Sequence, residues 1–187
     1  MHSGESLDNP VTGTRVVWRR TSLETGGLAV VVEVFLEPNG HVPPLHVHPR
    51  QLERVEVLAG SLGTRVGRRH AVVGPGARLA IPAGVRHRLW NAGTDTAQLM
   101  VEVTPALAYE SLLRTMFALA AAGRTNARGL PGPLLLAAVA ADHFDTVRLP
   151  FPPPPVQRLG LALAAPLGRA LARRAVRSKT GHSGRVH

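Results

Sequence analysis

Short β-prone segments, interrupted by glycine or proline about every ten residues, fill the first half of the chain. Residues 15–21 and 28–37 are rich in valine, and the second segment ends at a Pro-Asn-Gly turn. Six further candidate strands lie at residues 55–58, 62–66, 70–73, 78–81, 86–90 and 98–103. No helical pattern lies between them. Short strands at this spacing predict an antiparallel β-sandwich or barrel.

The composition changes after Pro105. Helix formers fill residues 106–122, a second helix is predicted over 132–144, and a third over 156–177. The proline run at 150–155 predicts a short stiff connector before the third helix.

These patterns divide the chain into two parts. The sequence predicts a mainly β domain over residues 11–105, a helical C-terminal extension over 106–177, and disordered ends at 1–10 and 178–187.

The net charge of +10 resides mainly in the extension. Residues 1–105 hold 11 basic and 9 acidic groups, whereas residues 106–187 hold 11 basic and 3 acidic groups. A strongly basic chain suggests a nucleic-acid or anionic-membrane partner. Because the β domain is nearly neutral, its chemistry has to be argued from its residues and not from the total charge.

The chain has no cysteine, which excludes disulfides, thiolate catalysis and cysteine-ligated metals. Any metal site would need histidine and carboxylate ligands, and nine histidines are available. Neither a signal-peptide pattern nor an apolar run of membrane-spanning length is visible, so we expect a soluble cytoplasmic protein.

One candidate site lies in the segment from Gly40 to Gly60. His46 and His48 are two residues apart, so on an extended strand both imidazoles point the same way. Glu53 shares the inward face of the next strand with valines. A buried carboxylate among valines is costly unless a positive charge compensates it, and a metal ion held by the two histidines would do so.

A second candidate segment runs from Gly76 to Asn91. A Pro-Ala-Gly turn at Pro82–Gly84 precedes a strand on which His87 points inward. Arg86 and Arg88 flank this histidine and take the opposite face. The segment therefore aims a single imidazole at the interior.

These two segments resemble the two motifs of the cupins. Glycine, five residues, His-x-His, four residues, Glu, six residues and glycine is matched from Gly40 to Gly60. Glycine, five residues, Pro-x-Gly, two residues, His, three residues and Asn is matched from Gly76 to Asn91. All ten fixed positions agree, and the resemblance covers approximately residues 11–105.

The resemblance implies a cupin double-stranded β-helix, a jelly-roll-type barrel with a metal inside. It implies that the metal ligands are His46, His48, Glu53 and His87. The chemistry of a carboxylate ligand adds a role as a catalytic base for Glu53 if it detaches. Such ligands suit one divalent transition metal, and Fe, Mn, Ni, Co, Cu and Zn stay open. It also implies a homodimer.

We therefore expect a mononuclear metal-dependent enzyme acting on a small, largely apolar organic substrate. Dioxygenase-type chemistry leads, with metal-assisted cyclase or isomerase chemistry close behind. The alternative is a non-catalytic cupin that binds a small ligand or metal as a sensor or accessory module.

The third predicted helix carries a leucine every fourth residue from Leu159 to Leu171, together with several arginines. This pattern favours packing of the leucine stripe on the barrel or on a partner subunit. Contact with an anionic membrane surface or partner is the alternative. Nucleic-acid binding is disfavoured, because aromatic residues are few and no helix-turn-helix pattern is present.

Overall fold

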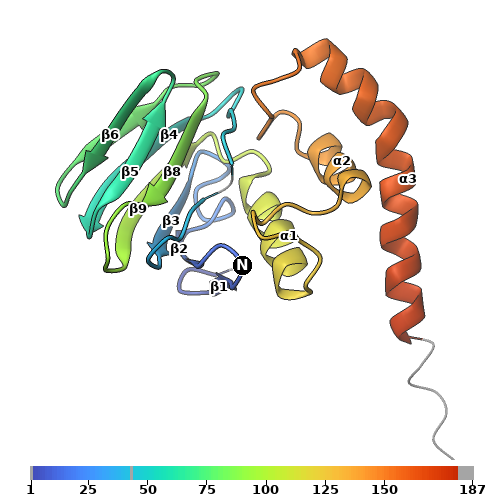
Figure 1. The fold of residues 1–187 in the computed structure, drawn as a ribbon, viewed down its shortest axis with the longest axis horizontal. Helices are drawn as coiled ribbons and strands as arrows, with labels where there is room; N and C mark the ends of the chain where they lie inside the picture. Colours follow the sequence, from blue (N-terminus) through green and yellow to red (C-terminus); the bar gives the residue numbers. More distant parts are fainter. Residues whose placement is uncertain (1, 43, 181–187) are drawn as a thin grey trace, which may run out of the picture.

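The computed structural model describes residues 2–42 and 44–180, which form two antiparallel sheets followed by helices (Figure 1). The strands are β1 (Ser6–Asn9), β2 (Thr14–Arg20), β3 (Val30–Leu36), β4 (Leu52–Ala59), β5 (Leu62–Val66), β6 (Arg69–Val73), β7 (Arg78–Ile81), β8 (His87–Asn91) and β9 (Ala97–Thr104). The helices are α1 (Tyr109–Ala121), α2 (Pro133–Asp142) and α3 (Pro154–Thr180). The predicted fold class, mainly β with a helical extension, is confirmed.

The strands form a six-stranded sheet, ordered β1-β2-β3-β9-β4-β7, and a three-stranded sheet, ordered β6-β5-β8. Apolar side chains of both sheets meet in one core cluster, to which the larger sheet contributes Val32 and Val101 and the smaller sheet Leu62 and Leu89. Burial alternates residue by residue along β9, as expected for a strand with one face on the core. The two sheets therefore enclose a common interior.

The disorder predicted for residues 1–10 is wrong for Ser6–Asn9, which form strand β1. This strand pairs with β2 in a hairpin, and the Asn9 side-chain oxygen accepts hydrogen bonds from the N–H groups of Val11 and Thr12 at 3.1 and 3.2 Å. The segment contains no β-branched residue, so the strand depends on this turn and on its neighbour.

Helix α3 is longer than predicted at both ends. Prolines are tolerated in the first turn of a helix, where no N–H is needed, so the helix begins at Pro154, inside the expected connector. Its backbone continues to Thr180, past the predicted end at Arg177. The remainder of the tail predicted to be disordered, residues 181–187, lies outside the described residues.

The extension packs on the barrel through α1. Phe117 of α1 joins the core cluster, and Arg114 forms an ion pair with Glu5 at 3.0 Å, next to β1. The Glu110 carboxylate accepts a hydrogen bond from the Ser22 N–H at 2.6 Å. Among the described helices, none combines the length and the apolar content needed to cross a bilayer.

Helix α3 packs on α2 and not on the barrel (Figure 1). The face that meets α2 carries small residues, of which Ala165 and Gly168 are buried. The leucine stripe lies on other faces of the helix and is exposed. Packing of the stripe on the barrel, one of the predicted arrangements, is therefore wrong within this chain, because α2 separates α3 from the sheets.

We expect Gly168→Leu to release α3 from α2. A Cβ at this position would lie 1.9 Å from the Leu134 carbonyl oxygen and 3.2 Å from the Ala138 Cβ, so the backbones could not keep their present distance. Overpacking of this kind costs about 1–3 kcal/mol, and trypsin should cleave α3 about tenfold faster or more. Gly160→Leu is the matched control, since a Cβ there meets nothing within 4 Å. Equal cleavage rates in the two variants would contradict the packing described.

Candidate metal centre

Two segments distant in the sequence run side by side and position the histidines. The His46 N–H donates to the His87 carbonyl at 3.1 Å, and the His87 N–H donates to the His46 carbonyl at 2.9 Å. The Gly84 N–H donates to the His48 carbonyl at 2.8 Å. Backbone hydrogen bonds thus hold together the two sequence motifs that predict the site.

Glu53 comes from β4, in the interior of the six-stranded sheet. Its neighbours on the same face are Val55 and Val57, and all three are buried, as the alternation of the sequence predicts. Glu53 is paired in register with Ile81 of β7 and with Val103 of β9. The carboxylate is therefore attached to backbone that is hydrogen-bonded on both sides.

The side chains of all four predicted ligands converge in the barrel. His46, His48, Glu53 and His87 are between 1% and 8% exposed, and each offers a ligand atom within 4.8 Å of the others. The Nε2 atoms of His46 and His48 lie 3.3 Å apart. Glu53 Oε2 lies 2.8 Å from His87 Nε2 and 3.7 Å from His48 Nε2.

Each histidine is oriented by a hydrogen bond from its other ring nitrogen. The Nδ1 atoms of His46, His48 and His87 lie 3.1, 2.6 and 3.0 Å from backbone carbonyl oxygens of Pro44, Thr146 and Val85, respectively. A carbonyl oxygen only accepts, so each Nδ1 carries the proton and each neutral ring presents an Nε2 lone pair. The backbone therefore fixes the tautomer in which three lone pairs face the Glu53 carboxylate.

Burial and mutual charge shift the pKa values of the four groups. Burial, and then the neighbouring His87 and His48, lower the pKa of His46 to about 3, and burial lowers the pKa of His48. Burial alone would raise the pKa of Glu53, but contact with His87 and the charges of the histidines hold it at about 2. Burial opposes protonation of His87, yet the Glu53 carboxylate raises its pKa overall. The cluster thus favours one proton at the His87–Glu53 pair and neutral rings elsewhere.

The donor set fits a divalent metal ion. Glu53 Oε2 and His87 Nε2 are buried without a well-directed hydrogen-bond partner among the described residues, although they lie 2.8 Å apart. Orphaned buried atoms of this kind cost about 1–3 kcal/mol each unless a ligand satisfies them. Three imidazole nitrogens and one carboxylate oxygen suit the first-row transition metals from Mn to Zn and leave open positions in an octahedral ion.

The extension contributes two groups that sequence reasoning missed. The carbonyl that orients His48 belongs to Thr146, between α2 and α3. The Tyr109 ring, at the start of α1, lies 5.8 Å from the His48 ring between centroids, in an edge-on arrangement. Burial, and then the charge of Glu53, raise the pKa of the Tyr109 hydroxyl. The tyrosine, which lies beyond the predicted barrel in the sequence, therefore folds back onto the site.

Two amides support the site from outside the ligand set. Gln51 is fully buried, and its side-chain nitrogen donates to the carbonyls of Pro105 and Ala106 at 2.9 and 3.0 Å, which attaches the extension to the barrel. Asn91 donates to the Leu36 and Asp95 carbonyls at 2.8 Å. These bonds fix the loop that follows β8.

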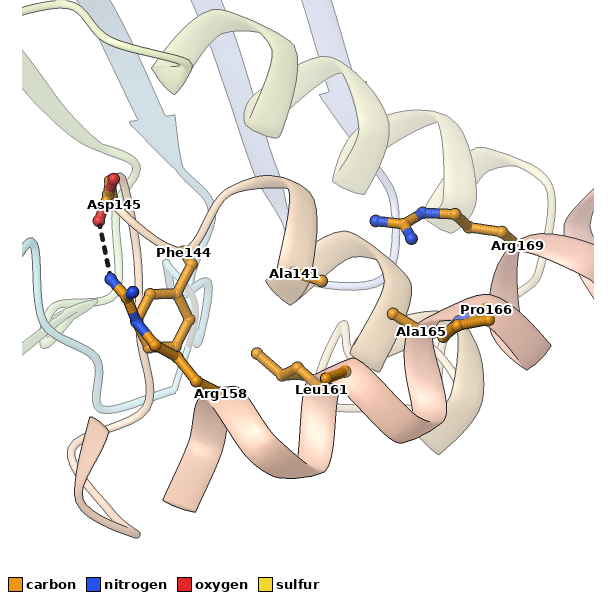
Figure 2. A pocket seen from close by; sticks show the side chains of 9 residues that line it. Ala141, Phe144, Asp145, Arg158, Leu161, Ala165, Pro166 and Arg169 are labelled. Carbon is orange, nitrogen blue, oxygen red and sulfur yellow. Dashed lines mark ion pairs between the residues drawn. The ribbon is translucent and has the colours of Figure 1, made fainter. Parts of the chain in front are cut away.

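Two cavities of about 420 Å³ each lie away from the four ligands. One lies between α2 and α3, where Phe144 and Leu161 form apolar walls and Arg158 is paired with Asp145 (Figure 2). The other lies on the six-stranded sheet beside Met100 and Arg54. Neither cavity is lined by any of the four ligand residues.

Comparison with known proteins relates this arrangement to one family. Residues 32–103 match the model of the cupin domain. Germin-like protein 3-7 of Oryza sativa subsp. japonica is 39% identical over 84 residues, which are 42% of this chain and 35% of the germin-like protein. The match thus spans about a third of that relative.

Solved structures are similar to parts of this chain. An RmlC-like cupin from Shewanella frigidimarina aligns with a TM-score of 0.50 at 17% identity, over 57% of this chain and 88% of its own. The polyketide cyclase RemF from Streptomyces resistomycificus aligns with a TM-score of 0.44 at 26% identity, over 49% of this chain and 65% of its own. The first of these similarities supports the double-sheet architecture described above.

Proposed function

The chain belongs to the cupin superfamily, and on this premise we propose that it is a mononuclear metal-dependent enzyme acting on a small, largely apolar organic molecule. The observation that carries the proposal is the convergence of three Nε2 lone pairs and one carboxylate within 4.8 Å. The backbone carbonyls of Pro44, Thr146 and Val85 hold the Nδ1 atoms of the three histidines, so their Nε2 atoms are the ones available to ligate an ion.

His46, His48, Glu53 and His87 would hold the ion. A bound divalent ion would supply Lewis-acid polarisation of a carbonyl or enol group, or activation of dioxygen beside the substrate. The low pKa of Glu53 keeps it ionised at neutral pH, so its charge partly neutralises a dication. The same carboxylate is the group that accepts a proton if it moves away from the ion.

Tyr109 provides a second protic group. Because burial and the Glu53 charge raise its pKa, its hydroxyl stays protonated at neutral pH. The Tyr109 ring lies next to the His48 ring, so we propose that its hydroxyl donates a hydrogen bond to a substrate bound beside His48.

Oxygen dependence separates the two leading reaction classes. We expect the metal-loaded protein to consume dioxygen with phenolic or enolic substrates, and we expect Glu53→Gln to reduce the rate by about 100-fold or more. Conversion of a substrate without oxygen would instead identify cyclase or isomerase chemistry. The Glu56→Gln variant is the control, since Glu56 lies on the same strand but pairs with Arg78 outside the barrel.

A non-catalytic metal- or ligand-binding module is the second candidate. The observation that favours it is the burial of all four ligands, none of which is more than 8% exposed. A protein that binds metal stoichiometrically but turns over neither aerobic nor anaerobic substrates would support this candidate over the enzyme.

A further inference from the structure

One face of α3 is apolar and uncovered. Its residues recur at every fourth position and keep most of their side-chain surface exposed: Leu159 is 67% exposed, Leu163 71%, Leu167 60% and Leu171 47%. Residues four apart lie on one side of a helix. These four leucines, here called the leucine stripe, therefore form a continuous apolar surface.

The opposite face of α3 is already occupied. Leu161 and Ala165 point toward α2 and Ala141 (Figure 2). The Gly168 backbone lies so close to Leu134 of α2 that no side chain would fit between them. The helix therefore cannot bury the leucine stripe by rotation without giving up this packing.

The chain entering α3 extends the apolar surface. Phe151 is 76% exposed, Leu149 is 48% exposed, and Val156 in the first turn is 55% exposed. In soluble proteins, exposed apolar surface of this extent marks a site that binds a membrane or another protein.

Charge distinguishes between the possible occupants. Asp142 and Asp145 are the last acidic residues of the sequence, and they are paired with Arg169 and Arg158 on the α2 side. Residues 146–187 contain eight basic residues and no acidic one. Two copies of this helix would bring positive charge together with no acid to offset it. A negatively charged surface supplies the missing complement.

We propose that α3 and the segment leading into it lie on the surface of an anionic lipid bilayer, with the leucine stripe at the boundary between headgroups and acyl chains. A long helix with one exposed apolar face and a cluster of basic residues toward its C-terminal end has features of interfacial helices. The barrel and its metal centre would then be held at the membrane. The proposal does not depend on the reaction that the metal centre supports.

Vesicle sedimentation with the full-length protein tests the proposal. We expect vesicles with about 30% phosphatidylglycerol to pull down the protein, and vesicles of pure phosphatidylcholine to bind it about tenfold more weakly or less. Raising the salt from about 0.1 M to 0.5 M should also release most of the protein.

A double variant provides the matched comparison. Leu163→Glu with Leu167→Glu should reduce binding to the anionic vesicles about tenfold or more, because it places two charges in the stripe. Leu23→Glu with Leu28→Glu makes the same change at two leucines that are 87% and 73% exposed in the loop between β2 and β3. This control should bind like the wild type, and both variants should keep the wild-type metal content.

Several results would overturn the proposal. Failure to bind anionic vesicles, equal binding to neutral ones, or equal binding by the stripe variant would each do so. Light scattering of the lipid-free protein addresses the other occupant. A dimer that the stripe variant converts to monomers would identify the leucine stripe as an interface between two copies of the chain.

Discussion

Purified protein is expected to contain about one transition-metal ion per chain, and His48→Ala or Glu53→Gln is expected to lower this to less than about a tenth. Loss of His48 removes one of three imidazole donors whose lone pairs converge. Loss of the Glu53 charge leaves a dication among neutral imidazoles in a buried site. Each change should weaken binding far more than the roughly 10- to 100-fold typical of outer-shell changes. Elemental analysis after gel filtration measures the result.

The control variants carry the same types of substitution at a histidine and a glutamate outside the metal centre. His70→Ala removes an exposed histidine of β6, and Glu56→Gln neutralises a carboxylate on the outer face of β4. Both should retain wild-type metal content. A wild-type protein that carries no metal and takes up neither Fe, Mn nor Ni would contradict the assignment of the site and the proposed enzyme with it.

The inward direction of the candidate ligands could be predicted from strand alternation, and the resemblance to the cupin motifs joined them into one ligand set. Alternation along an extended strand places Glu53 with Val55 and Val57 on one face, and the structure confirms this face as the inner one. The spacing from Pro82 to His87 fixes a turn followed by a strand. Such features depend on residues that are close in the sequence, so a sequence pattern is enough to predict them.

The groups from the extension could not be predicted in the same way. Thr146 contributes a backbone carbonyl, which every residue has, and it reaches His48 across 98 positions of sequence. Tyr109 approaches the same histidine only because Gln51 and the core hold the start of α1 against the barrel. No local pattern encodes such a return of the chain.

The position of the leucine stripe on the exposed side of α3 could not be predicted from local sequence either. The i, i+4 spacing correctly predicts a helix with an apolar face, but the face that packs on α2 is marked only by Ala165 and Gly168. Small residues let two helices pack closely, but they leave no strong hydrophobic pattern in the sequence. Dimerisation and a cytoplasmic location stay predictions.

The metal-free protein is expected to lose stability steeply as the pH falls from about 6 to 4.5. The folded state keeps His46 and His48 neutral because their pKa values are lowered, to about 3 for His46. Their stabilisation is complete above the unfolded value of about 6.5 and is lost as the pH falls below it. His87 acts in the opposite sense, because its raised pKa lets the folded state bind a proton.

The pH dependence of the unfolding free energy is set by the number of protons that the chain takes up on unfolding. In this pH range the unfolded chain protonates its histidines, whereas the folded chain keeps His46 neutral throughout and binds less proton at His48, so unfolding takes up about one proton at His46 and a further fraction at His48. Each proton corresponds to about 1.4 kcal/mol of unfolding free energy per pH unit, which is a sizeable share of the stability of a typical domain. Urea denaturation in the presence of a chelator, repeated at several pH values, measures the slope.

Replacing one of the two neutral histidines tests the origin of the slope. His46→Leu removes a group that the unfolded chain protonates and the folded chain does not, so the slope should fall by about 1.4 kcal/mol per pH unit. At low pH the free energy of unfolding of this variant should exceed that of the metal-free wild type, because the variant has no imidazole at position 46 whose protonation favours the unfolded state. An unchanged slope in this variant, or a wild-type stability that rises on acidification, would show that the neutral buried rings do not control the acid sensitivity of the barrel.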